Sequence, residues 1–226
     1  MTPPANAPRL EVTKTYKLYI NGAFPRSESG RSIAVEDGSG QVIAHAAHCS
    51  RKDLRDAVEA AHAAQPKWAD ASAYNRGQVL YRMAEMMEGK RGEFVDALDA
   101  WEKGTKARRH GGTKGRAKSP DRQIARSPGA LAEVDAAIDR LVCFAGWADK
   151  YAQVLGCNNP VAGPYYNFTI PEPTGVVGVI TPSNGPALLS LISLLAPSLC
   201  AGNSIVAIAG DHSMIPAAVF GEVCAT

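Results

Sequence analysis

Apolar residues recur at the three- and four-residue spacing of an amphipathic helix in four stretches of the first two thirds of the chain. This spacing predicts helices over residues 51–65, 74–89, 91–103 and 131–151, with Ser50 placed to cap the first. The apolar faces of these helices are Leu54, Val58, Ala61 and Ala64; Val79, Leu80, Met83 and Met87; Phe94, Leu98 and Trp101; and Val134, Ile138, Leu141 and Ala145. The side chains named in the second helix are expected to be buried.

Strand-like patterns lie between and around these helices. Residues 16–24 alternate in polarity and turn at Asn21-Gly22, a dipeptide that favours a tight hairpin. Residues 42–45 form another short strand candidate, and residues 160–172 are expected to be extended and exposed.

A strand–helix–strand unit is predicted near the end of the chain. The short apolar run 176–180 has the β-branched bias of a strand buried on both faces. Residues 186–199 then predict a buried helix, with Pro186 at its first position and Gly202 ending it. A second apolar run, residues 205–209, follows.

Two strands joined by a crossover of this length are expected to pair in parallel. Ligands of such sheets bind beyond the carboxyl ends of the strands. The sequence therefore places a candidate site at residues 181–185 and 209–211.

Residues 103–126 differ in composition from the rest of the chain. They contain nine Lys or Arg against one Asp, several glycines and few apolar residues. Such a segment cannot bury enough surface to order itself, which predicts a disordered insert over residues 104–129. A basic arm for nucleic acid or another polyanion is the alternative; a solvated loop is preferred because no stacking aromatic is interleaved.

Composition narrows the classes of function. The chain has 226 residues, a net charge of +2 and 46% hydrophobic residues, as in ordinary globular proteins. Five cysteines without a C-x-x-C pair argue against a zinc site or a disulfide framework, and no metal is expected. No apolar run is long enough for a membrane span and none at the start is typical of a signal peptide, so a cytoplasmic location is expected.

Several ordered blocks resemble one enzyme family. EPTGVVGVITPSNGP, followed by LAPSLCAGNSIVAIAGD, is similar to the start of the cofactor domain of NAD(P)-dependent aldehyde dehydrogenases. Upstream, YKLYINGAF, DLRDAVEAAHAAQPKWAD and AEVDAAIDRLVCFAGWADKY resemble the amino-terminal part of the same family. YNRGQVLYRMAEMME and the altered loop residues most resemble the degenerate second module of two-module aldehyde dehydrogenases.

The resemblance implies an α/β fold, in which an amino-terminal helical and β-hairpin region packs against the first βαβ unit of a Rossmann-like parallel sheet. The implied division is a flexible tail at 1–15, the hairpin and helical region at 16–151, an oligomerisation-type strand at 152–172 and a truncated cofactor-binding domain at 173–226. In the family the segment that matches residues 164–172 crosses to the oligomerisation sheet, which implies a homo-oligomer or an aldehyde dehydrogenase partner. Tyr166, Phe168 and Ile170 are expected on one face of this edge.

The resemblance also assigns a catalytic position. Asn184 matches an asparagine whose amide donates to the oxyanion formed from an aldehyde substrate; the alternative is that Asn184 only caps the next helix. Ser183 stands where the family has Trp, and Gly185 where it has a large apolar residue.

The cofactor positions are partly altered. The family holds NAD or NADP with backbone that matches Ile180, Thr181, Pro182 and Ser183, and with a Lys-to-Glu run after the second strand. In this chain Ile208 replaces that lysine, while Asp211 retains the carboxylate. Cofactor binding is therefore expected to be weak or lost. His212, beside Asp211, is expected at the surface.

The family's general-base glutamate and nucleophilic cysteine lie downstream of the segment that matches residues 211–226. Cys200, in a small-residue helix context, is interpreted as structural, and Cys224 has no recognisable partner. The sequence thus predicts an incomplete and inactive oxidoreductase module. The alternative is a non-catalytic module that assembles with a catalytic aldehyde dehydrogenase.

Overall fold

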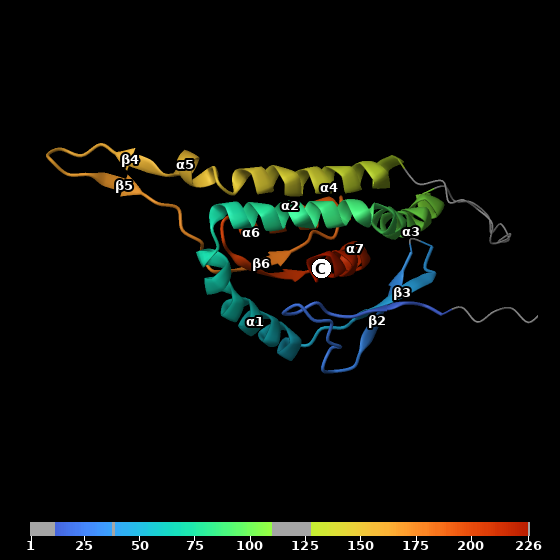
Figure 1. The fold of residues 1–226 in the computed structure, drawn as a ribbon. Helices are drawn as coiled ribbons and strands as arrows, with labels where there is room; N and C mark the ends of the chain where they lie inside the picture. The colour runs from blue at the N-terminus through green and yellow to red at the C-terminus, as the bar shows by residue number, and fades with distance from the viewer. Residues whose placement is uncertain (1–11, 38, 110–127, 226) are drawn as a thin grey trace, which may run out of the picture.

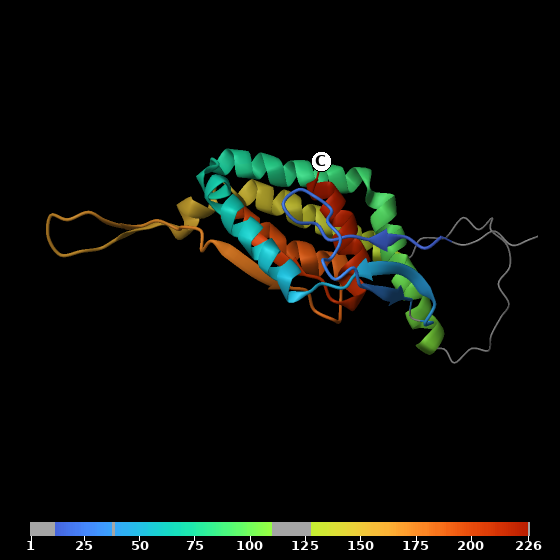
Figure 2. The ribbon, with the colours of Figure 1, turned by 90° about the horizontal axis from the view of Figure 1, so that it is seen from below.

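The fold is a helical layer packed on a small parallel βαβ unit, with a second small sheet at the amino-terminal side and a projecting hairpin (Figures 1 and 2). The computed structural model describes residues 12–37, 39–109 and 128–225. Its strands are β1 (Thr15–Tyr16), β2 (Ser32–Glu36), β3 (Val42–Ala47), β4 (Cys157–Asn159), β5 (Asn167–Thr169), β6 (Val176–Ile180) and β7 (Ser204–Ile208). Its helices are α1 (Arg51–Asp70), α2 (Ala73–Gly89), α3 (Arg91–Arg109), α4 (Pro128–Trp147), α5 (Tyr151–Leu155), α6 (Ala187–Cys200), the 3-10 turn η1 (Asp211–Ser213) and α7 (Met214–Cys224).

The amino-terminal sheet has the order β1-β3-β2, with β1 parallel and β2 antiparallel to β3. The predicted turn is present, since Asn21 and Gly22 both have positive φ (51° and 75°), and Ile20 bridges to Ala23. The strand expected at 42–45 is β3. Strand β2 was not predicted, because its exposed positions give it little apolar pattern.

The four predicted helices are present, and their starts agree within a few residues. Helix α1 extends beyond the expected end at 65 to Asp70, although Pro66 lies inside it. Pro66 is exposed, so the carbonyl that loses its partner can be solvated. The extra turn is held by Trp68, whose Nε1 donates to the carbonyl of Leu199 at 3.0 Å.

The core lies where the helices meet. Leu80, Met87, Phe94, Val134 and Leu141 are fully buried, together with Leu188 and Ile192 of α6. Figure 1 shows α2 and α4 running side by side over α6. Val79 was expected in this core but is 45% exposed, because it lies about 100° around α2 from Leu80.

The structure changes the boundaries of the basic insert. Helix α3 continues to Arg109, and α4 starts at Pro128, so both ends of the stretch 104–129 are helical rather than disordered. Residues 110–127 of the predicted insert lie outside the described residues, as do residues 1–11 of the predicted tail.

The region expected as one extended strand is a short helix followed by an antiparallel hairpin. Helix α5 occupies residues 151–155, and β4 then pairs with β5, with Asn158 opposite Phe168. This hairpin projects from the body in both ribbon views (Figures 1 and 2). Its turn falls within the stretch 160–172, where a continuous strand was expected.

The start of α1 is tied to the preceding loop by a buried carboxylate. Asp53 completes a capping box with Ser50, whose backbone N–H donates to Oδ2 at 2.7 Å. The Ser27 hydroxyl donates to the same oxygen at 2.7 Å, and the Glu28 N–H donates to Oδ1 at 3.1 Å. The hydrogen bonds from Ser27 and from the Ser50 N–H lower the pKa of Asp53 to about 2.

Replacing the Asp53 carboxylate is expected to lower the free energy of unfolding. It should also make that free energy less dependent on pH in the acid range. Asp53→Asn loses the charge-assisted bonds, and the free energy of unfolding should fall by about 1–2 kcal/mol at pH 7. In the unfolded chain the pKa of Asp53 is close to 3.9, above its folded value, so its contribution is present above pH 4 and is lost as the pH falls toward 2. Urea unfolding across this pH range should therefore show a shallower acid decline in Asp53→Asn.

Asp56→Asn on the same helix is the matched control, because Asp56 is a surface residue next to Arg55. Equal effects of the two substitutions would contradict the role given to Asp53.

Candidate functional site

The candidate site is the edge of the sheet where β6 and β7 end. The two strands pair in parallel over their full length, from Val176 opposite Ser204 to Ile180 opposite Ile208. This pairing confirms the strand–helix–strand prediction. The expectation that residues 176–180 are buried on both faces is wrong: only Val179 is buried, because the described sheet has two strands and leaves β6 with an open edge. The last pair is exposed, with 72% of Ile180 and 47% of Ile208 accessible. Both side chains therefore border the surface on which a ligand of such a sheet is held.

Two hydrogen bonds hold the loops after β6 and β7 together. The Thr181 N–H donates to the carbonyl of Ile208 at 3.1 Å, and the Gly210 N–H donates to Thr181 Oγ1 at 2.7 Å. A Cβ atom at Gly210 would lie 3.2 Å from the Thr181 carbonyl oxygen and 3.3 Å from that of Pro182. A glycine thus permits the close approach of the two loops. Thr181 itself is buried, whereas Pro182 is exposed.

The loop that leads to α6 faces solvent. Ser183, Asn184 and Gly185 are exposed, and Gly185 has a φ of +95°, which favours glycine. The alternative that Asn184 caps α6 is wrong, because Pro186 is the N-cap and no side-chain cap comes from this segment. Pro186 was expected inside the helix and lies one position before it.

Glu133 supplies the missing cap from another helix. Its Oε1 accepts hydrogen bonds from the Leu188 N–H at 2.7 Å and from the Leu189 N–H at 3.2 Å. Sequence reasoning missed this residue. No local signal could have found it, because Glu133 lies on α4, 55 residues before Leu188.

The segment after β7 turns inward directly behind Asp211. Asp211 is exposed and opens η1, but His212 is only 8% exposed. The expectation that His212 lies at the surface is therefore wrong. Its ring lies 6.0 Å from that of Trp101, and its Nε2 has no hydrogen-bond partner among the residues that the structure describes. The 3-10 turn places His212 under the helical layer, an arrangement that its short polar context does not reveal.

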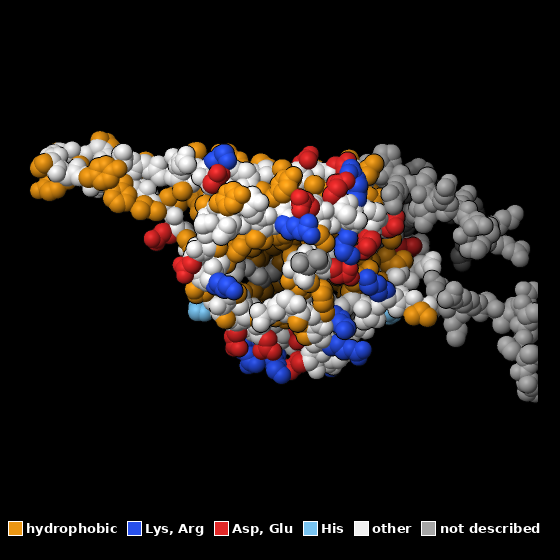
Figure 3. All heavy atoms as spheres, viewed as in Figure 1, with side chains coloured by type: hydrophobic (Ala, Val, Ile, Leu, Met, Phe, Trp, Pro, Cys, Tyr) orange, Lys and Arg blue, Asp and Glu red, His pale blue; other side chains and the backbone are white. Residues whose placement is uncertain are grey.

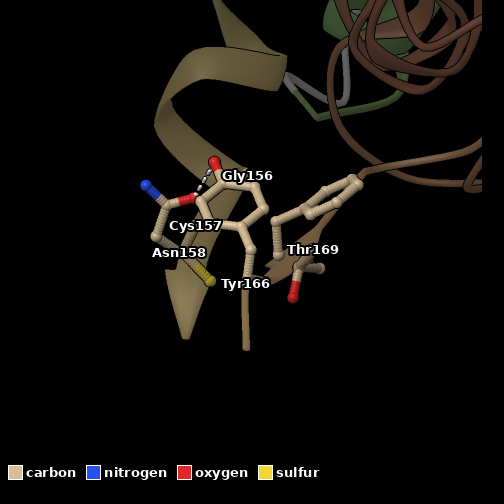
Figure 4. A pocket seen from close by; sticks show the side chains of 6 residues that line it. Gly156, Cys157, Asn158, Tyr166 and Thr169 are labelled. Atoms are coloured by element: carbon tan, nitrogen blue, oxygen red, sulfur yellow. Dashed lines mark hydrogen bonds between the residues drawn. The ribbon is translucent and has the colours of Figure 1, made fainter. Parts of the chain in front are cut away.

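A concave surface lies on the hairpin, away from the β6–β7 edge. A pocket of about 330 Å³ is lined by residues of β4 and β5, among them Cys157 and Phe168 (Figure 4). The Tyr166 hydroxyl donates to Asn158 Oδ1 at 2.7 Å across the two strands. This pocket contains no residue that the sequence assigned to chemistry.

The described ranges contain neither a metal-binding cluster nor a membrane-spanning helix. There, no group of three or more His, Cys, Asp or Glu side chains is suited to hold a metal ion. In the same part of the chain, no helix has the length and apolarity needed to cross a membrane.

Comparisons with known proteins agree with the sheet and loop order. The model of the aldehyde dehydrogenase family matches residues 24–117 and 125–226. The mitochondrial aldehyde dehydrogenase family 2 member B4 of Arabidopsis thaliana is 33% identical over 219 residues, which are 96% of this chain and 36% of that protein. Retinal dehydrogenase 2 of Mus musculus is 31% identical over 224 residues, 97% of this chain and 38% of that protein.

Solved structures of similar fold include a salicylaldehyde dehydrogenase from Pseudomonas putida G7 in complex with salicylaldehyde. That structure has a TM-score of 0.76 and 22% identity, and the match covers 94% of this chain and 39% of the other. The chain thus spans little more than a third of the length of the relatives it matches. The fold is the expected α/β arrangement of their amino-terminal part. Because the family model matches most of its residues, the chain belongs to the aldehyde dehydrogenase family.

Proposed function

We propose that this chain forms the amino-terminal part of an NAD(P)-dependent aldehyde dehydrogenase module, which oxidises an aldehyde to a carboxylic acid. The observation that carries the proposal is the parallel β6–β7 pair, whose end loops are joined by the Thr181–Gly210 hydrogen bond. In this proposal the cofactor lies over residues 180–183 and 208–211, and Asn184 faces the substrate.

The residues at this edge fit a dinucleotide only in part. The close approach at Gly210 leaves accessible backbone beside Pro182 and Ser183, which suits a flat ligand held by main-chain groups. Ile208 cannot donate a hydrogen bond to a ribose, and Asp211 offers only an acceptor. Losing one charge-assisted hydrogen bond costs about 10- to 100-fold in affinity. We therefore propose that NAD or NADP, which would supply the hydride acceptor, is bound weakly.

Asn184 is suited to the role of oxyanion donor because the residue is exposed and its side chain is not used to cap α6. A side-chain amide in this role contributes about 3–4 kcal/mol to transition-state stabilisation. The exposure of Ser183 and Gly185 beside it leaves the donor in contact with water, which weakens its effect.

None of the cysteines is placed to act with Asn184. Cys200 ends α6, and the 14-residue helix separates it from the loop by about 20 Å. Burial raises the pKa of the Cys200 thiol, and burial raises the pKa of Cys224 to about 12. Cys49 lies in the loop between β3 and α1, Cys143 on α4 and Cys157 on β4. We propose that the 226-residue polypeptide alone does not oxidise aldehydes.

A second candidate function is assembly, either with copies of this chain or with a catalytic aldehyde dehydrogenase. The hairpin favours it, because Tyr166, Phe168 and Ile170 are 74%, 53% and 64% exposed. Figure 3 shows hydrophobic side chains gathered along this projection. An exposed two-stranded edge with apolar side chains is a template for pairing with another chain.

Restoring a lysine after β7 is expected to strengthen nucleotide binding. Ile208→Lys should increase the affinity for NAD by up to about 100-fold, because an ammonium can donate to the ribose. Isothermal titration calorimetry checks the affinity. Val79→Lys is the control for added charge, since Val79 has a similar exposure on α2, 45% against 47%. Equal gains in the two variants, or no binding in any form of the protein, would oppose the proposed cofactor site.

The Ile208→Lys variant should show no turnover when NADH absorbance is followed with an aldehyde substrate.

The cysteine thiols of the unaltered protein should differ in their reactivity toward an alkylating reagent. At pH 8, alkylation of the native protein should label the exposed Cys143 and Cys157 first, whereas Cys200 and Cys224 should react only after unfolding. Aldehyde oxidation that disappears in Cys200→Ala or Cys224→Ala would identify a nucleophile and refute this assignment.

Removing an aromatic ring from the hairpin is expected to reduce self-association. Light scattering of the unaltered chain at high micromolar concentration should show oligomers, and Phe168→Ser should shift them toward monomer. Tyr81→Ser, on α2, is the control, because Tyr81 is 48% exposed but lies off the hairpin. A monodisperse unaltered monomer would contradict the assembly function.

A further inference from the structure

We propose that Glu133 is a positioning residue for the Asn184 loop. This inference rests on the proposed function in so far as Asn184 is the oxyanion donor. In this proposal the Glu133 side chain, on α4, holds the end of the loop between β6 and α6 in place.

The first turn of α6 depends on an acceptor from elsewhere in the molecule. The first N–H groups of a helix have no partner within it, and the N-cap of α6 is Pro186, which offers no side-chain acceptor. Glu133 Oε1 takes the Leu188 and Leu189 N–H groups at 2.7 and 3.2 Å. A carboxylate at this position is also stabilised by the helix dipole.

The Asn184 loop is therefore tied at both ends. At its start, Thr181 is bound to Ile208 and Gly210. At its end, Leu188 is bound to Glu133. Asn184 lies near the middle of this short span, next to Gly185 with its positive φ. A glycine beside the donor gives the loop freedom, so the direction of the Asn184 amide depends on the two anchors.

Packing alone would keep α6 in place without Glu133. Leu188, Leu191 and Ile192 are buried against the helical layer, to which α4 contributes Val134. Loss of the Glu133 carboxylate should thus release the first turn and the loop, while the rest of α6 stays folded. This local effect distinguishes positioning from general stability.

The negative charge of Glu133 stabilises the first turn of α6 but does not help to stabilise an oxyanion near that turn. A carboxylate at the amino terminus of α6 offsets the positive end of the helix dipole. Stabilisation of an oxyanion beside this helix then falls to the side-chain amide of Asn184. Glu133→Gln separates the two effects, because its amide oxygen accepts hydrogen bonds but carries no charge.

The test compares Glu133→Ala and Glu133→Gln with Ser72→Ala. Ser72 caps α2 by accepting from the Asn75 N–H at 3.2 Å, so its loss is a matched cap removal on a helix that does not carry the loop. Amide hydrogen exchange and NMR of the full chain report on the backbone of residues 183–189 and on the Asn184 side-chain amide.

In Glu133→Ala, exchange at Leu188 and Leu189 should accelerate about 5- to 30-fold, the size of a lost cap. The Asn184 side-chain resonances should shift or broaden in the same variant. In Glu133→Gln the exchange rates and the Asn184 resonances should stay close to those of the unaltered chain. Ser72→Ala should change neither the exchange at Leu188 and Leu189 nor the Asn184 resonances. If Glu133→Ala does not fold, Glu133→Asp provides the same comparison, since its shorter side chain cannot reach both N–H groups.

Unchanged Asn184 resonances in Glu133→Ala, or an equal change in Ser72→Ala, would overturn the positioning role. These readouts need no nucleotide, so they are independent of the proposed cofactor site. Titration of NAD into Ile208→Lys, with and without Glu133→Ala, tests that site separately.

Discussion

The buried guanidinium of Arg76 joins the two halves of the structure. Only 8% of Arg76 is exposed, and its Nη1 donates to the carbonyls of Ala69 and Ala71 at the end of α1. Its Nε donates to the carbonyl of Cys200 at the end of α6, at 3.2 Å. The carboxyl ends of helices carry partial negative charge, so one cation satisfies two of them at once. The helical layer and the βαβ unit are thereby held at a fixed distance.

This junction also sets the direction in which β7 leaves α6. Gly202, with a φ of +87°, follows the end of α6, and the Asn203 N–H donates back to Ser198 in the pattern of a Schellman motif. A Cβ at Gly202 would meet Ala69 at 3.5 Å and Pro173 at 3.6 Å, so the turn is enclosed by the end of α1 and by the segment that precedes β6. After this turn β7 pairs with β6 up to Ile180 opposite Ile208, and Thr181 then meets Gly210 just beyond the last pair.

The sequence predicts the βαβ unit within about a residue at each end, because two short apolar strands and an apolar helix leave continuous runs that local turns delimit. It also predicts that residues 181–185 and 209–211 share one edge. It does not predict Glu133 as the cap of α6 or the burial of His212, since both result from contacts between distant segments. The end of α1 is missed for the same reason, because Trp68 binds a carbonyl 131 residues away. The roles of Asn184, Ile208 and Asp211 remain predictions.

The hairpin β4–β5 differs from the rest of the molecule in one respect that bears on its evolution. None of residues 157–170 is buried, so substitutions there remove almost no packing from the folded body. Mutations at Tyr166 or Phe168 should therefore change the stability of the folded body very little, whereas mutations at the buried Leu80 or Phe94 should lower it. Amino-acid replacements in the hairpin therefore reflect the contacts between its own two strands and any contact that it makes outside its own chain.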